Sequence, residues 1–135
     1  RDCYHAFQRG DSESMFAIFA PDIEWESVGR REDFPTLGPR RGIAQVREFF
    51  RLVAENLEFH AFTPSELHGV GNIVFVMGRY DMTIRRTGRR AASDFLHVFW
   101  VRNGKVTRFR EFTDTARFAE GWRVRPGEPA SRALS

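Results

Sequence analysis

The sequence predicts an α+β fold, with helices in the first half of the chain and strands in the second. Apolar residues recur at helical spacing before residue 57, and from residue 58 onward apolar runs are separated by hairpin-length turns. The 135 residues are 41% hydrophobic and 29% charged, which is typical of one globular domain with a core. We therefore expect a single domain over residues 1–124. Residues 125–135, rich in Pro, Gly and Ser, are expected to form a flexible tail.

Two short helices are expected first. Tyr4 and Phe7 lie at helical spacing, and Gly10 is a helix stop. Asp11 then stands where an N-cap would, and the second helix ends before Pro21.

A strand over residues 23–28 follows. Its alternation places Ile23, Trp25 and Ser27 on one face and Glu24 and Glu26 on the other. Gly and Pro punctuate residues 29–42, which we expect to be a long irregular loop. Residues 43–57 have the apolar spacing of an amphipathic helix.

The second half predicts four strands, over residues 58–69, 73–84, 91–102 and 105–113. Short connections such as Asn103-Gly104 make the sheet mostly antiparallel. The second and third of these strands are apolar on both faces. Since the helices can cover only one face, we expect the outer face to be covered by a second subunit, giving a homodimer.

Composition excludes several classes of protein. The pI is about 9.7, but 20 of the 21 basic residues are Arg, and the Arg pairs lie in Gly- and Pro-punctuated segments rather than along one helix face, so no nucleic-acid partner is expected. No apolar run approaches the ~18 residues of a membrane span, so we expect no membrane association. Cys3 is the only cysteine, which favours a reducing cytoplasm.

No cofactor is expected. The four histidines show no metal-ligand spacing, so no metal site is predicted. Phosphate-binding loops and nucleophile motifs are also missing from the sequence.

Glu111 is the first candidate catalytic residue. Alternation in the last strand places it on one face with Phe109, while Arg108 and Arg110 take the other. An aromatic environment is expected to raise the pKa of this carboxyl and to suit it to proton transfer. The alternative is a carboxylate near the sheet edge or in a salt bridge across a dimer.

Whether His97 can reach Glu111 depends on the turn between their strands. A two-residue Asn103-Gly104 loop would pair His97 with Arg110 and place it on the face opposite Glu111. A three-residue loop closed by a Gly bulge would pair His97 with Phe109, making His97 and Glu111 diagonal neighbours. The sequence permits both. His97 is also consistent with a hydrogen-bonded core residue.

Arg79-Tyr80-Asp81 is another candidate group. Arg79 and Asp81 are two residues apart on a strand and share a face, where an arginine can orient a carboxylate. The alternative is an ion pair at the end of the strand.

Several short motifs follow one another in a fixed order: Gly10-Asp11, Phe19-Ala20-Pro21-Asp22, Gly42 before the amphipathic helix, His97-Val98-Phe99, Asn103-Gly104-Lys105-Val106, Arg110-Glu111-Phe112 and Asp114. Their order and spacing resemble the SnoaL-like branch of the NTF2-like superfamily, up to about Phe118. The resemblance implies a cone-shaped α+β barrel in which helices pack inside a curved sheet around an apolar pocket, commonly as a dimer through the sheet's outer face.

Family members differ in function, so their residues are compared one by one. The pattern of ketosteroid isomerases fails, because its catalytic acids would fall at Ser27 and near Leu96. The polyketide cyclase pattern places its His and acid on His97 and Glu111, with Glu in place of Asp.

The limonene-epoxide-hydrolase pattern places its Arg and acids on Arg79, Asp81 and Glu111. Its water-positioning residues would be Trp25 and Ser27, which are poorly suited to holding a water.

The main interpretation is a pocket for a small apolar organic molecule, lined by Trp25, Phe95, Phe99 and Phe109 with Ser27 nearby. Glu111 would act as general acid or base with His97, in an isomerase, cyclase or dehydratase reaction. Two alternatives are a binding protein without turnover and an epoxide hydrolase using Arg79, Asp81 and Glu111.

Overall fold

The computed structural model describes residues 11–124 and 127. The helix expected over the first ten residues, Cys3 and nearly all of the expected tail lie outside the described residues. The elements in chain order are α2 (Ser12–Ala17), β1 (Phe19–Ser27), β2 (Gly38–Arg41), α3 (Gly42–Asn56), β3 (Leu57–Val70), β4 (Ile73–Ile84), β5 (Arg89–Arg102), β6 (Lys105–Thr113) and α4 (Thr115–Trp122).

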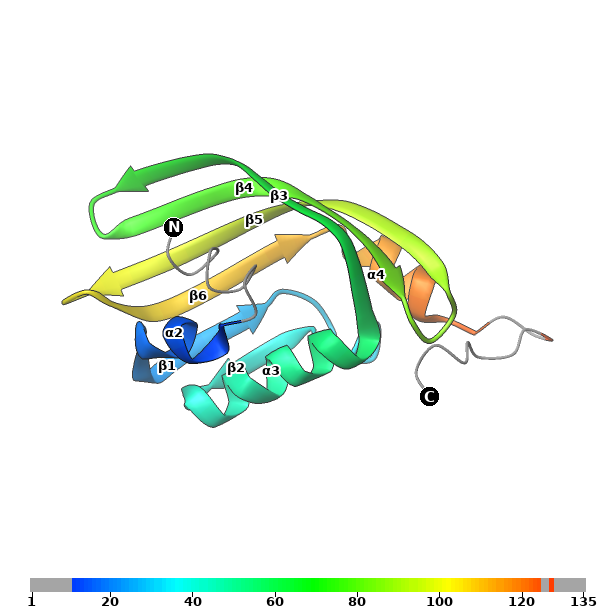
Figure 1. Cartoon of the computed structure of the whole chain (residues 1–135), viewed down its shortest axis with the longest axis horizontal. Coiled ribbons are helices and arrows are strands. Elements are labelled where there is room, and N and C mark those ends of the chain that lie inside the picture. Colours follow the sequence, from blue (N-terminus) through cyan, green and yellow to red (C-terminus); the bar gives the residue numbers. More distant parts are fainter. Residues whose placement is uncertain (1–10, 125–126, 128–135) are drawn as a thin grey trace.

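The strands form one six-stranded sheet in the order β2-β1-β6-β5-β4-β3. Only the β1–β6 pair is parallel, and the other four pairs are antiparallel. Figure 1 shows the sheet curving over α3, with β2 and β3 at its two edges. The predicted α+β class and mostly antiparallel sheet are confirmed. The expected curved sheet packed around a helix is also confirmed, and its two edge strands, β2 and β3, do not pair to close it.

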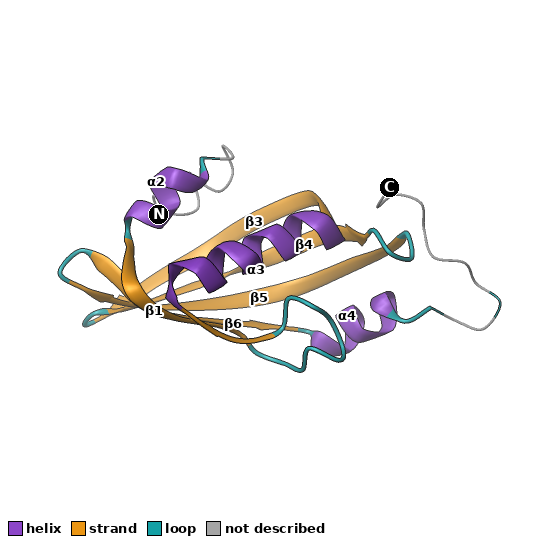
Figure 2. Cartoon of the chain, turned by 90° about the horizontal axis from the view of Figure 1, so that it is seen from below, coloured by secondary structure: helices purple, strands orange, loops and turns teal. Residues whose placement is uncertain are grey.

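Helix α3 covers the concave face of the sheet (Figure 2). It buries Val46, Phe49 and Val53, one stripe of the amphipathic pattern that predicted it. The predicted cap of α2 is also present, since the Asp11 side chain accepts a hydrogen bond from the Ser14 backbone N–H at 3.2 Å. Among the described residues, no helix has the length and apolarity needed to cross a membrane.

The expected loop over residues 29–42 is only partly a loop, because it contains β2, which pairs antiparallel with β1. A buried arginine holds this segment: Arg40 donates to the carbonyl oxygens of Thr36 at 2.7 Å and Pro35 at 3.1 Å. The guanidinium thus supplies hydrogen bonds within this segment that neither alternation nor turn signals reveal.

Helix α4 was not predicted. It begins directly after β6, and its Phe118 packs edge-to-face on the fully buried Phe34, with ring centroids 5.3 Å apart. An eight-residue helix is marginal by itself, so its stability comes from this packing rather than from a strong local pattern.

Candidate functional site

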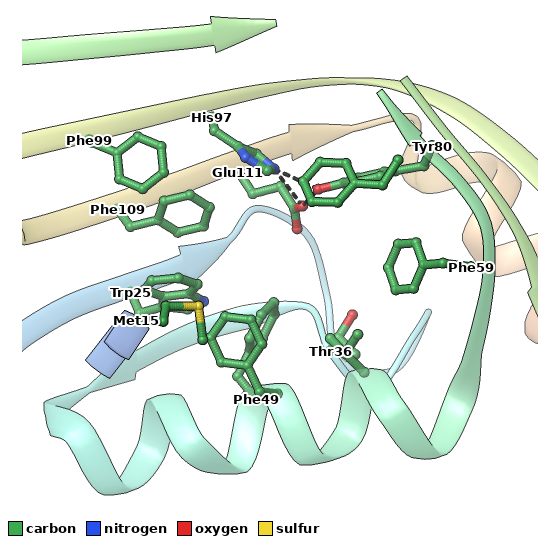
Figure 3. A pocket seen from close by; sticks show the side chains of 13 residues that line it. Met15, Trp25, Thr36, Phe49, Phe59, Tyr80, His97, Phe99, Phe109 and Glu111 are labelled. Atoms are coloured by element: carbon green, nitrogen blue, oxygen red, sulfur yellow. Dashed lines mark hydrogen bonds and ion pairs between the residues drawn. The ribbon is translucent and has the colours of Figure 1, made fainter. Parts of the chain in front are cut away.

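A pocket lies between α3 and the concave face of the sheet (Figure 3). The space between its walls, counted together with the solvent at its mouth, is about 620 Å³. Its walls are mostly aromatic: Met15, Trp25, Thr36, Phe49, Phe50, Val53, Phe59, Phe62, Tyr80, His97, Phe99, Phe109 and Glu111. Such a space suits a small organic molecule with apolar surface and few polar groups.

The Glu111 carboxylate lies at the polar end of this pocket and receives three hydrogen bonds. Ser27 Oγ donates to Oε1 at 2.7 Å. Tyr80 donates its hydroxyl proton to Oε2, and His97 Nε2 lies 3.0 Å from the same oxygen. Tyr80 Oη and His97 Nε2 are themselves 2.6 Å apart. The four side chains form one buried cluster around the carboxylate.

The hairpin between β5 and β6 brings His97 and Glu111 together in a way that neither predicted alternative describes. Asn103 and Gly104 have positive φ angles of 51° and 75°, and they form the two-residue turn that pairs Arg102 with Lys105. The pairing then shifts by one residue between Trp100 and Val101.

This shift is a β-bulge that places Thr107 as the extra residue of β6. Beyond it, His97 pairs directly with Glu111 instead of with Arg110. The turn is therefore the two-residue alternative, but the expected consequence, opposite faces, is wrong because the bulge reverses the alternation.

Strand β1 supplies two of the expected site residues. Its parallel pairing with β6 sets Ser27 beside Glu111 and Trp25 beside Phe109. The Trp25 and Phe109 rings stack with centroids 4.0 Å apart. Trp25, Phe99 and Phe109 line the pocket as predicted, whereas Ser27 reaches it through its bond to Glu111.

Phe95 packs against two residues of the site, His97 and Tyr80. It is not part of the pocket wall, but its ring stacks on His97 at 4.3 Å and on Tyr80 at 4.4 Å. It therefore fixes the orientation of the two rings that bond Glu111.

Tyr80 is the functional residue that the sequence interpretation missed. Strand alternation contains the signal, because Arg79 and Asp81 share one face and the residue between them must take the other. The remaining walls from α3 and β3 come from apolar positions that periodicity alone cannot separate from ordinary core.

Arg79 and Asp81 lie on the convex face of the sheet, away from Glu111. Arg79 Nη1 is 2.9 Å from Asp94 Oδ1, and Arg90 Nη2 is 2.8 Å from Asp81 Oδ2. The side chains of Arg79 and Asp81 are 60% and 41% exposed. The structure does not bring them together with Glu111; each forms a separate surface ion pair with a residue of the neighbouring strand β5.

The electrostatics of Glu111 differ from the expectation. Burial raises the pKa of this carboxyl. The hydrogen bond and the electrostatic attraction from His97, together with the hydrogen bonds from Tyr80 and Ser27, outweigh burial and hold the pKa below its ordinary value of 4.5. The expected net rise is therefore wrong in direction, and Glu111 is an anion at neutral pH.

In the described part of the chain, no cluster of three or more His, Cys, Asp or Glu side chains is arranged to hold a metal ion. The polar groups of the pocket are the carboxylate, the phenol, the imidazole and the hydroxyl around Glu111, the indole N–H of Trp25, and the hydroxyl of Thr36 (Figure 3).

Known proteins resemble this chain in sequence and in fold. The profile of the SnoaL-like domain family matches residues 1–109, a stretch that ends just before Glu111. An NTF2-like protein from Burkholderia thailandensis is 35% identical, with 90% of this chain and 92% of that chain covered and a TM-score of 0.81. An NTF2-like protein from Burkholderia xenovorans is 31% identical, with 90% and 91% covered and a TM-score of 0.81.

TerC, co-crystallised with polyporic acid, is 28% identical, with 89% of this chain and 92% of that chain covered and a TM-score of 0.75. Among curated proteins, none matches the chain. The family profile covers most of the chain and the fold agrees with it, so the chain belongs to the SnoaL-like branch of the NTF2-like superfamily.

Proposed function

We propose that this protein is a proton-transfer enzyme for a small apolar organic molecule, with Glu111 as general base. The reaction would be of the isomerase, cyclase or dehydratase kind. The observation that carries the proposal is a buried carboxylate in the wall of an aromatic pocket, kept ionised by three hydrogen-bond donors. An anion placed against an apolar ligand can accept a proton without competition from bulk water.

The two carboxylate oxygens have different roles. Oε2 is bonded by both Tyr80 and His97, which occupy its two lone pairs. Among residues 11–124, only Ser27 bonds Oε1, which leaves this oxygen one lone pair for a substrate proton. In Figure 3 the oxygen without a dashed line points toward α3, into the pocket. Oε1 is therefore the basic atom in this mechanism.

Tyr80 and His97 complete the mechanism as positioning residues. They hold Glu111 ionised before the reaction. Once Oε1 has taken a proton, the carboxyl is neutral and the hydrogen bonds from Tyr80 and His97 to Oε2 become weaker.

The comparisons support a small organic ligand. The chain belongs to the SnoaL-like family, and a structural relative, TerC, was crystallised with the organic molecule polyporic acid. The aromatic walls of the pocket provide the apolar surface that such a ligand would bury.

The second candidate is a binding protein that holds the same ligand without turnover. The lowered pKa of Glu111 favours it, because a carboxylate stabilised by three donors is a weak base. Epoxide hydrolysis by Arg79, Asp81 and Glu111 is not proposed, because two of these residues lie on the other face of the sheet.

We also propose a homodimer through the convex face of the sheet. Met77, Leu96 and Phe112 are neighbours across three strands there, and Met77 and Phe112 are 43% and 37% exposed. A row of large apolar side chains on the outside of a sheet is typical of an interface.

The test replaces Glu111 with Gln and follows the exchange of α-protons in 2-tetralone, an apolar ketone, for deuterium by NMR in D2O. We expect the wild type to accelerate exchange and Glu111→Gln to lower the enzymatic rate by roughly 10²–10⁴-fold, while ketone affinity changes little, because the amide keeps the shape and loses the base. Glu58→Gln, at an exposed position of β3, is the matched control.

Exchange by Glu111→Gln at the wild-type rate would contradict the assignment of the base. Binding of the ketone by the wild type with no exchange above that in buffer would support the binding protein instead.

A further inference from the structure

Trp25 carries a polar group that nothing in the described structure satisfies. Its side chain is only 3% exposed, it lines the pocket, and its Nε1 is buried without a hydrogen-bond partner among the described residues. Figure 3 shows the indole nitrogen on the edge of the ring that faces the centre of the pocket. This donor is therefore directed at the space where a ligand would lie.

Such a donor is unfavourable in the free protein. A buried N–H without an acceptor loses its hydrogen bond to water and gains nothing in return. The rings of Phe49 and Phe50, each with its centroid 5.4 Å from that of Trp25, can offer the N–H only a weak contact with a π face. A ligand with an acceptor oxygen at this position would supply the missing hydrogen bond.

The position of Trp25 relative to Glu111 limits where that acceptor lies. Trp25 and Ser27 are two residues apart on β1, and Ser27 pairs with Glu111. The indole and the carboxylate thus project onto the same concave face, displaced by one i,i+2 step of roughly 7 Å along the strand. An acceptor bonded to the indole would therefore lie on the same face of the sheet as the Glu111 carboxylate.

We propose that Trp25 Nε1–H is a second polar anchor of the site, one that selects ligands with an acceptor oxygen placed against the indole. This inference rests on the proposed function and adds a residue that determines its ligand specificity. A ligand whose carbonyl oxygen accepts this hydrogen bond would bind more tightly than a hydrocarbon of the same ring size.

The direct test observes the indole N–H signals of the intact protein by ¹H–¹⁵N NMR. The three tryptophan signals are assigned from Trp25→Phe, Trp100→Phe and Trp122→Phe, so the Trp25 signal is known by elimination even if Trp25→Phe does not fold. The probes are 2-tetralone and tetralin, the hydrocarbon of the same ring size without the oxygen. We expect the ketone to move the Trp25 proton signal downfield, as a new hydrogen bond does, and tetralin to produce no such downfield shift.

Affinity provides the second measurement. The loss of one hydrogen bond predicts that Trp25→Phe weakens 2-tetralone binding by about 5- to 10-fold and tetralin binding by less than about twofold. Trp122→Phe, whose ring packs on Phe34 outside the pocket wall, should change neither affinity. Equal losses for both probes in Trp25→Phe, or a Trp25 signal that 2-tetralone leaves in place up to its solubility limit, would overturn the proposal.

The two proposals fail in different ways. A ketone-dependent shift of the Trp25 signal without any exchange of α-protons would remove Glu111 as the base and keep Trp25 as the anchor. Exchange that depends on Glu111 but leaves the Trp25 signal unmoved would remove Trp25 as the anchor and keep Glu111 as the base.

Discussion

Glu111 keeps its charge inside an aromatic pocket because its neighbours supply hydrogen bonds in place of water. Burial by itself favours the neutral acid. Donors from Ser27, Tyr80 and His97 surround the carboxylate within one cluster, and their combined effect exceeds that of burial. The sign of the shift is decided by these neighbours rather than by the apolar walls.

The first prediction follows from that sign. Because the pKa of Glu111 is lower in the folded protein than in the unfolded chain, the folded state binds fewer protons, and its stability falls with pH below about 4.5. Glu111→Gln should lack this contribution. Denaturant unfolding across this range should therefore show a smaller acid loss of stability in the variant than in the wild type. Equal losses would contradict the account, as would a wild type stabilised by acid in this range.

For single residues, the sequence predicts which side chains face the pocket better than it predicts the pKa of Glu111. Alternation placed Glu111, Phe109 and Trp25 on pocket-facing positions, because residues two apart on a strand share a face. It did not reveal the sign of the pKa shift, which depends on Tyr80 and Ser27 arriving from strands distant in sequence.

The bulge in β6 determines that His97 and Glu111 face the same pocket. The turn at Asn103-Gly104 alone would place His97 and Glu111 on opposite faces, and the extra residue, Thr107, returns them to the same one. A bulge has no strong local signal in the sequence, so periodicity predicted the strands and the turn but left the register open.

The close packing of β4 against Phe95 requires a glycine at position 78. A Cβ at this position of β4 would lie 2.4 Å from Phe95 Cζ and 2.5 Å from the backbone oxygen of Thr63. The absence of a side chain therefore lets the Phe95 ring lie close to β4, where it stacks on Tyr80 and His97.

The second prediction is that Gly78→Ala destabilises the fold by about 1–3 kcal/mol, because the methyl group overpacks the sheet face. It should also slow exchange, since Phe95 must move and the two rings that bond Glu111 move with it. Gly69→Ala is the matched control: this strand glycine has no neighbour within 4 Å of an added Cβ, and its stability effect should stay within about 0.5 kcal/mol. A Gly78 variant as stable as the control would show that Phe95 is not held in this way.

At the scale of the whole molecule, the curved sheet has two different faces. The concave face is covered by α3 and contains the pocket, while the convex face combines exposed apolar side chains with arginines. Arg108 lies over the Trp100 ring and Arg110 over the Phe112 ring, at 4.6 and 5.1 Å from the ring centroids. The amphipathic pattern of residues 43–57 predicted a helix that packs on one face of the sheet. The two strands that are apolar on both faces predicted that the convex face is buried in an interface.

The third prediction is a dimer at micromolar concentration that buries more than about 1,000 Å² through this convex face. Replacing both Met77 and Phe112 with Glu should give a monomer, because four buried charges at a two-fold interface are costly to desolvate. Val70→Glu, an exposed apolar position at the β3–β4 turn, should leave the dimer intact. Sedimentation analysis distinguishes these outcomes, and a monomeric wild type would remove the interface.

A titration of the Glu111 side-chain carboxyl by ¹³C NMR, with the signal assigned from its loss in Glu111→Gln, measures whether this largely buried group is an anion facing the pocket. We expect a pKa below 4.5 in the wild type and a higher pKa in Tyr80→Phe, which lacks one of the hydrogen bonds that lower it. A wild-type pKa above 4.5, or one that Tyr80→Phe leaves unchanged, would contradict the account.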